Sequence, residues 1–156
     1  MIHRLWVSNS SPLIIFQRIG RFNMLEQIHD RWFIPSAVRQ EVFGSNVVPA
    51  WITEQPLSQP LAAHILAARL GAGESAAIAL AVEMQATRIL LDDLPARRLV
   101  QALNIPAMGS LGILLLAKEQ GLIPAIRPLI EAMQQADFRV SESVLLKILV
   151  AAGEAV

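Results

Sequence analysis

Short strand-like segments alternate with helical segments along this chain, and almost nothing in the sequence indicates a β-hairpin. Parallel strands need a crossover connection, usually a helix, whereas hairpins join antiparallel neighbours. The predicted strands cover Leu5–Ser8, Arg31–Ile34, Arg88–Leu91 and Pro106–Gly109, with a further short strand near Ala50–Thr53. We therefore predict an α/β fold: a three-layer α/β/α sandwich with a mostly parallel central sheet.

Proline, glycine and serine mark the predicted helix ends. Ser11 and Pro12 begin the first helix and Gly20 ends it, as expected for an N-cap, a first-turn proline and a C-terminal glycine. The predicted helices cover Leu13–Ile19, Phe22–Ile28, the segment capped by Ser36, Leu61–Leu70, Glu74–Gln85, Pro95–Leu103, Leu111–Glu119, Ile126–Gln135 and Ser141–Ala152. No change of composition divides the 156 residues, which indicates a single domain over residues 1–156.

The chain is unusually apolar for a water-soluble domain, with 54% hydrophobic and only 17% charged residues. Some apolar surface therefore needs a partner, and a homodimer is the expected arrangement. The apolar runs are far shorter than the roughly 20 residues that cross a bilayer, so we expect no membrane span. The N-terminal segment does not resemble a secretory signal and the chain has no cysteine, so a cytoplasmic location is expected.

Charge balance restricts the kind of nucleic acid that the chain can bind. Thirteen basic and thirteen acidic residues cancel, which excludes a broad basic surface of the kind that holds duplex DNA through many phosphates. Any contact with nucleic acid is therefore expected to be local.

Acidic or acid-like side chains stand where apolar segments end, and the first of them is an asparagine. They are Asn9, Glu41, Glu74 and the pair Asp92 and Asp93. Sites in parallel sheets lie beyond the carboxyl ends of the strands, where Asn9 and the aspartate pair fall. Glu41 shares a helical face with Ala37 and Val38, and Glu74 shares one with Ile78 and Ala81, so both are expected to face inward.

Each of these positions also has an ordinary structural interpretation. Glu74 suits the positive end of a helix dipole, Asp93 suits the N-cap of the helix at Pro95, Asp92 suits a solvated turn, and Glu41 could extend into water. Asn9 is a common turn former after a strand. Their joint placement favours a functional cluster, because clustered carboxylates repel one another and are compensated by a divalent cation, Mg²⁺ or Mn²⁺.

Five segments in this order resemble the PIN-domain family, in particular its bacterial and archaeal branch with an NSSPLI-type start. The segments are VSNSSPLI, IPSAVRQEV, GAGESAAIALA, ILLDDLPARRLVQALNIPAMGSLGILLLAKEQGLI and FRVSESVLLKILVAAGE. Members of that family are typically divalent-metal-dependent ribonucleases, and many are toxins held inactive by a small antitoxin. The resemblance implies a Mg²⁺- or Mn²⁺-dependent nuclease, single-stranded RNA as its substrate and a small antitoxin protein as a partner.

Carried across by position, the resemblance assigns roles to individual residues. Glu41, Glu74 and Asp93 match three metal-binding acids, with Asp92 as the competitor for the third. The remaining matches are Ser10 and Ser11, the hydroxyl positions after the first acid, and Ser110, a polar position at the rim.

Asn9 departs from the family, whose catalytic members usually carry aspartate there. An amide oxygen can still bind Mg²⁺, but it adds no charge. Arg97 and Arg98 follow the acid pair and are open to two interpretations: steering of a substrate phosphate, or salt bridges to Asp92 or Asp93.

Two hypotheses follow from these residues. The first is a PIN-like ribonuclease whose activity depends on how far Asn9 weakens the site. The alternative is a catalytically degenerate PIN-like module that acts through protein or RNA binding. Asn9 favours the alternative, as does the apolar stripe of Val144, Leu145, Ile148 and Leu149 in the tail helix, which Leu146 and Val150 widen.

Overall fold

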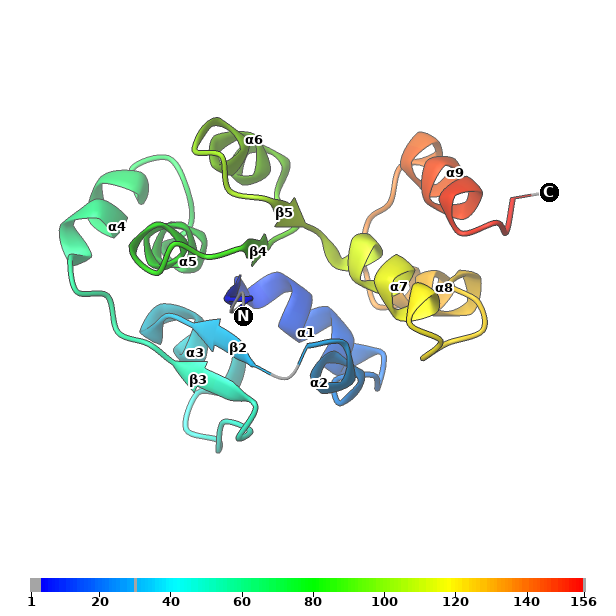
Figure 1. The fold of residues 1–156 in the computed structure, drawn as a ribbon, viewed down its shortest axis with the longest axis horizontal. Helices are drawn as coiled ribbons and strands as arrows, with labels where there is room; N and C mark the ends of the chain where they lie inside the picture. The colour runs from blue at the N-terminus through cyan, green and yellow to red at the C-terminus, as the bar shows by residue number, and fades with distance from the viewer. Residues whose placement is uncertain (1–3, 30, 156) are drawn as a thin grey trace.

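A computed structural model describes residues 4–29 and 31–155. Its single sheet has five strands in the order β3-β2-β1-β4-β5, and every pairing between neighbours is parallel (Figure 1). The strands are β1 (Trp6–Ser8), β2 (Trp32–Ile34), β3 (Ile52–Glu54), β4 (Arg88–Leu90) and β5 (Ala107–Met108). The predicted α/β fold with a parallel central sheet is confirmed, and the sheet is parallel throughout the described residues.

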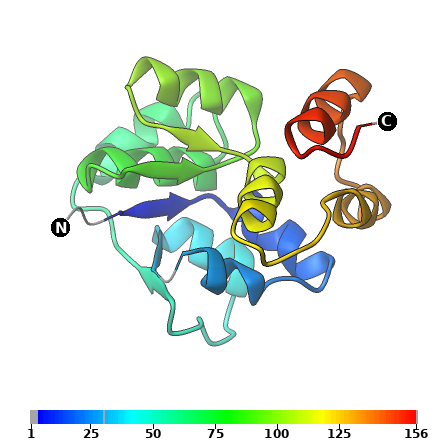
Figure 2. The same ribbon diagram turned by 45° about the vertical axis from the view of Figure 1, so that its right-hand side comes forward.

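Helices connect all of these strands in the described chain. They are α1 (Ser10–Arg18), α2 (Met24–Ile28), α3 (Ser36–Phe43), α4 (Pro60–Leu66), α5 (Ala72–Glu83), α6 (Leu94–Ala102), α7 (Ser110–Glu119), α8 (Arg127–Gln135) and α9 (Glu142–Ala151). Helices α7, α8 and α9 lie together near the C-terminus, to one side of the sheet (Figure 2). Among the described residues, none of these helices is long and apolar enough to cross a membrane.

The strand order reverses at β1. The chain places β2 and β3 on one side of β1 and then crosses to the other side for β4 and β5. The Asn9 amide continues the β1–β4 pairing by donating to the Leu90 carbonyl at 2.8 Å. A crevice forms where the order of a parallel sheet reverses, and ligands bind there. The segments that follow β1 and β4 therefore mark the expected place of a site.

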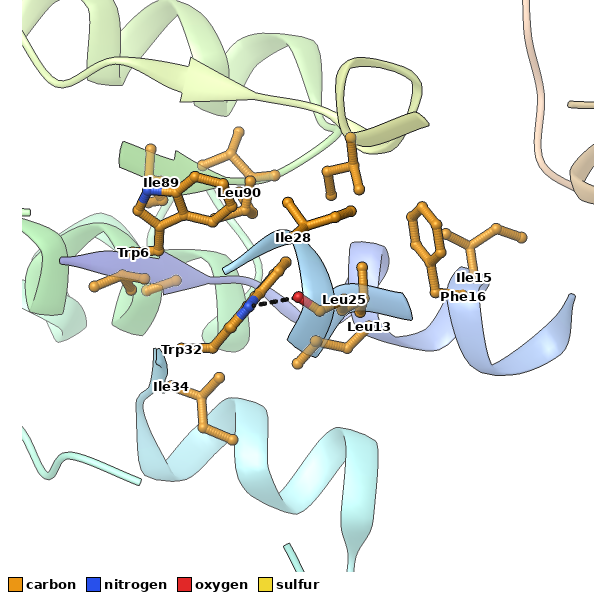
Figure 3. Packing of buried hydrophobic residues seen from close by; sticks show 14 of the residues in the cluster. Trp6, Leu13, Ile15, Phe16, Leu25, Ile28, Trp32, Ile34, Ile89 and Leu90 are labelled. Atoms are coloured by element: carbon orange, nitrogen blue, oxygen red, sulfur yellow. Dashed lines mark hydrogen bonds between the residues drawn. The ribbon is translucent and has the colours of Figure 1, made fainter. Parts of the chain in front are cut away.

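Large apolar side chains from both halves of the chain make one core around the sheet (Figure 3). Trp32 on β2 is fully buried, and its indole N–H is hydrogen-bonded to the carbonyls of Leu25 (3.2 Å) and His29 (2.7 Å). A buried indole N–H without a partner would cost free energy. These bonds fix α2 and the turn after it against the edge of β2.

Several predicted helix boundaries differ from the structure. Ser11, the predicted N-cap of the first helix, lies inside α1, and Asn9 holds the cap position. Ser36 is the first residue of α3, and Pro35 occupies the cap position without a side-chain bond. The helix predicted from Leu61 to Leu70 begins at Pro60 and ends at Leu66. A turn of irregular backbone follows Leu66, and Gly71 then becomes the N-cap of α5.

Carboxylates distant in sequence stabilise two helix starts. Glu83 accepts bonds from the Ser58 and Gln59 amides just before α4, and the Ser58 amide is the main cause that lowers the pKa of Glu83. Glu154 accepts from the Ile126 and Arg127 amides at the start of α8. Negative charge is favourable at a helix N-terminus, so both contacts tie distant segments to the fold.

The apolar stripe predicted for the tail helix is divided between two sides of α9. Leu149 is buried, and Leu145 and Ile148 are partly buried against the core. Leu146 and Val150 are 59% and 60% exposed. The inner side of α9 therefore completes the core, and its outer side leaves apolar surface uncovered.

Candidate functional site

Asn9 lies at the carboxyl end of β1, at the point where the strand order reverses. It is the N-cap residue of α1 by backbone conformation, but its side chain makes no capping bond to that helix. The residue is only 6% exposed. The asparagine therefore lies at the carboxyl end of a central strand, where parallel sheets place their sites. Its side-chain amide does not cap α1.

Glu41, on α3, is held from α1. The Ser10 hydroxyl, almost fully buried, donates to Glu41 Oε2 at 2.9 Å. Val38 is buried, but Glu41 is exposed, so the prediction that Glu41 faces inward with Val38 is wrong. Residues three apart lie on one helical face, but the long side chain of Glu41 extends from the last turn of α3 to the Ser10 hydroxyl and stays exposed.

Glu74, in the first turn of α5, is half-buried and is influenced by two other acids. Burial is the largest cause that raises the pKa of Glu74, followed by the negative charge of Asp93. The Gly71 amide, 3.4 Å from Glu74 Oε1, opposes the rise, whereas a side-chain hydrogen bond with Asp93 and the charge of Glu41 add to it. Glu41, Glu74 and Asp93 are thus close enough to raise the cost of ionising Glu74.

Asp93 caps a helix, as the sequence predicts. Its Oδ2 accepts from the Ala96 amide at 3.0 Å, which makes it the N-cap of α6. Its negative charge also raises the pKa of Glu74 more than the charge of Glu41 does. A capping bond uses one oxygen and leaves the other available for a ligand.

Asp92 is turned to different partners and is not a solvated turn residue. Its Oδ2 accepts from the Ser11 hydroxyl at 2.9 Å and the Ser110 hydroxyl at 2.7 Å, and its Oδ1 accepts from the Ser110 amide at 2.7 Å. Ser110 is fully buried. Asp92 therefore ties the starts of α1 and α7 together, and Asp93 is the member of the pair that borders Glu74.

The two arginines of α6 lie differently. Arg97 Nη1 and Asp92 Oδ1 are 3.2 and 2.9 Å from the position that a Cβ on Gly109 would take, so both groups lie over the Gly109 backbone. Arg98 is exposed. Within residues 4–29 and 31–155, neither arginine forms an ion pair with Asp92 or Asp93. The salt-bridge interpretation is therefore wrong for the described residues.

The acids suit a divalent cation by their chemistry, without forming a complete cage. In the described part of the chain, no three His, Cys, Asp or Glu side chains are grouped so that they could hold a metal ion. Mg²⁺ commonly keeps several waters and binds through one or two carboxylates. The carboxyls of Glu74 and Asp93, with Glu41 close enough for its charge to act on Glu74, fit that mode of binding.

Two glycines that shape the cluster were not predicted as site residues. A Cβ on Gly73 would collide with the Glu41 carboxylate, and one on Gly109 would lie 2.9 Å from Asp92 Oδ1. The glycines of GAGES indicate a helix break in the sequence, but nothing local shows that Glu41, 32 positions earlier, packs on one of them. Such close approach of a backbone to a functional group is a common use of glycine.

The geometry agrees with the comparison of this chain with protein families. A family model described as a PIN domain matches residues 5–154. No match was found among curated proteins or among solved structures. The matched range includes every strand of the sheet and the residues Asn9, Glu41, Glu74, Asp92 and Asp93. The chain belongs to the PIN domain family.

Proposed function

We propose that this protein is a divalent-metal-dependent ribonuclease that cleaves single-stranded RNA, with Glu41, Glu74 and Asp93 as metal ligands. The observation that carries the proposal is the convergence of acids from separate elements: Ser10 holds the Glu41 carboxylate against Gly73, in the same turn of α5 as Glu74. Burial and the charge of Asp93 raise the pKa of Glu74, which agrees with this convergence. Selection rarely keeps acids that repel one another unless a cation compensates them. Mg²⁺ or Mn²⁺ is the matching cation for oxygen ligands.

Each residue of the cluster has a distinct part in this proposal. Glu74 and Asp93 would hold the cation together with Glu41, whose carboxylate is fixed by the hydrogen bond from Ser10. The bound cation supplies activation of water and neutralisation of charge at the scissile phosphate. Asp92, held by Ser11 and Ser110, is a positioning residue because it fixes the segment that carries Asp93.

Asn9 reduces the charge of this site by one. Its amide oxygen can take a ligand position, but it contributes no negative charge. We therefore expect weak cation binding and slow cleavage, compared with the same site carrying a carboxylate at position 9. The buried setting of Asn9 strengthens this effect, because electrostatic attraction is larger away from water.

The test compares the parent, Asn9→Asp and Glu74→Ala with a labelled single-stranded RNA and millimolar Mn²⁺ or Mg²⁺. We expect slow cleavage by the parent, faster cleavage by Asn9→Asp and none by Glu74→Ala. Cleavage by Glu74→Ala at the parental rate would exclude the assigned site. No cleavage by folded parent or folded Asn9→Asp with either metal would exclude the ribonuclease.

A second function is favoured by one feature of α9. Leu146 and Val150, one helical turn apart, expose apolar surface that suits a protein partner. In this alternative the chain is a catalytically degenerate PIN-like module that acts by binding. A small antitoxin protein or a second copy of the chain are the proposed partners, and a homodimer would cover this surface. Light scattering of the purified chain distinguishes a dimer from a monomer.

A further inference from the structure

A groove of about 610 Å³ lies beside the acidic cluster and is distinct from it. One wall is the start of α6, the floor is the segment from β5 into α7, and the other wall is the start of α9 with the residues before it. In both ribbon views, α6 and α9 stand on either side of the segment that joins β5 to α7 (Figures 1 and 2). The groove is therefore formed by segments that are distant in sequence.

The groove is basic although the chain as a whole is neutral. Three cationic side chains line it, namely Arg97, Arg139 and Lys147. Asp92 is the acid in its lining, and both oxygens of that carboxylate already accept hydrogen bonds from Ser11 or Ser110. An anionic ligand therefore meets positive charge along this groove, in a protein whose total charge is zero.

The rest of the lining is largely apolar, and part of it is open to solvent. Phe138 and Ile148 are partly buried there, whereas Val144 and Leu94 are 45% and 56% exposed. Single-stranded nucleic acids bind to surfaces of this composition, because phosphates pair with cations while unstacked bases lie on apolar and aromatic side chains.

The groove adjoins the segment that carries one acid of the proposed cleavage site. Asp92 and Arg97 line its α6 end, and Asp93 is the residue next to Asp92 in the chain. RNA is chosen over an acidic peptide because three cations and an aromatic side chain, Phe138, line the same groove and suit the phosphates and unstacked bases of a single strand.

We propose that this groove binds the single-stranded RNA that flanks the scissile phosphate, with Arg139 and Lys147 contacting its backbone. The proposal rests on the ribonuclease function and names the surface that holds the substrate. Both side chains are exposed and lie outside the acid cluster. They are therefore expected to contribute to RNA binding with or without a metal ion.

The experiment measures binding in EDTA, so that its outcome does not depend on cleavage. Fluorescence anisotropy with a labelled ten-nucleotide RNA of mixed sequence is titrated at several salt concentrations, for the parent and for Arg139→Ala/Lys147→Ala. Each single-strand phosphate contact contributes a slope of about 0.7 in the plot of log affinity against log salt. We expect the double variant to lose about 1.4 of that slope and at least tenfold in affinity at low salt.

The matched control removes the same number of charges elsewhere. Arg18→Ala/Arg69→Ala changes two exposed arginines that are not in the groove lining, and it should keep the parental slope.

Equal slopes and affinities for the groove variant and this control would overturn the proposal, even if the parent cleaves RNA. A Glu- and Leu-rich peptide that binds the parent more tightly than the RNA does, and loses affinity in the groove variant, would also overturn it, since the groove would then be a peptide site. Parental groove binding without any cleavage would instead count against the nuclease alone.

Discussion

The backbone of Gly73 lies against the carboxylate of Glu41, so close that a Cβ on Gly73 would be 3.0 Å from the Glu41 carboxyl carbon. This contact joins the first turn of α5 to α3 and determines where the Glu41 carboxylate lies. The other known constraint on that carboxylate is the hydrogen bond from Ser10. Both constraints come from outside α3.

Gly73→Ala tests this contact. The added methyl meets the far end of a flexible side chain, so Glu41 moves away and the fold persists; alanine also favours a helix over glycine. We expect a Tm within a few degrees of the parent, and Mn²⁺ affinity lower by about tenfold, the equivalent of roughly 1.4 kcal/mol. Isothermal titration calorimetry measures the affinity. Ala72→Gly, at an exposed neighbouring position, is the control for helix propensity. Unchanged Mn²⁺ affinity in Gly73→Ala would show that Glu41 is not a ligand.

Asn9→Asp should lower the stability of the metal-free protein and strengthen its binding of a cation. Because position 9 is buried, an aspartate there loses hydration when it ionises, so the metal-free variant should have a lower Tm than the parent at neutral pH. Added Mn²⁺ should raise the Tm of the variant more than that of the parent, because a cation that binds the folded state stabilises it. Differential scanning calorimetry with and without Mn²⁺ measures both effects.

Asn46→Asp provides the control for that experiment. Asn46 is exposed in the turn after α3, so the same chemical change there adds a solvated charge. Its Tm should respond to Mn²⁺ as the parent does. If Asn9→Asp behaves like Asn46→Asp, position 9 is not part of a cation site.

Glu74→Gln should stabilise the metal-free protein, in a manner that depends on pH. Because the folded protein raises the pKa of Glu74 above its ordinary value of 4.5, folding favours the protonated form. The stability of the parent therefore falls as pH rises from 4.5 through the folded pKa. Glutamine removes this loss, so the Tm advantage of the variant should be present at pH 7.5 and small below pH 4.5. An advantage that stayed constant with pH would contradict the assigned cause.

Glu154→Gln should show the opposite dependence on pH. Burial alone would raise the pKa of Glu154, but the Ile126 amide, Lys118 and the Arg127 amide outweigh it and lower the pKa from 4.5. The stabilisation by this carboxylate is therefore complete above pH 4.5 and is lost as pH falls through the lowered pKa. We expect the variant to melt a few degrees below the parent at pH 7, a shift that corresponds to about 1 kcal/mol in a domain of this size. The difference should vanish in acid, and Glu142→Gln, exposed at the start of α9, serves as the control.

Periodicity and helix-end residues predicted most of the fold, since each element depends on local chemistry. Pro12, Gly20 and Pro95 lie at or next to observed helix ends, and the alternation of elements predicted the parallel pairing. The β3-β2-β1-β4-β5 order depends on packing between segments far apart in the chain, which no local pattern encodes.

The candidate site could be predicted residue by residue but not in its arrangement. Strand ends and the family resemblance indicated Asn9, Glu74 and the aspartate pair. Which aspartate borders Glu74 depends on Ser11 and Ser110, whose hydroxyls turn Asp92 away. The position of the exposed Glu41 carboxylate depends on the Ser10 hydroxyl, which lies 31 residues earlier in the chain. Hydrogen bonds between distant segments decide both outcomes.

The central position of β1 also affects when the site can form during synthesis. Asn9 is made early, but β4, its neighbour in the sheet, follows more than half of the chain later, and Asp93 comes after β4. Nascent chains and prematurely terminated products that end before β4 therefore contain Asn9 and Glu41 without the partner strand that brings Asp93 to them. In a protein proposed to destroy RNA, this topology keeps incomplete chains inactive while their own message is still on the ribosome.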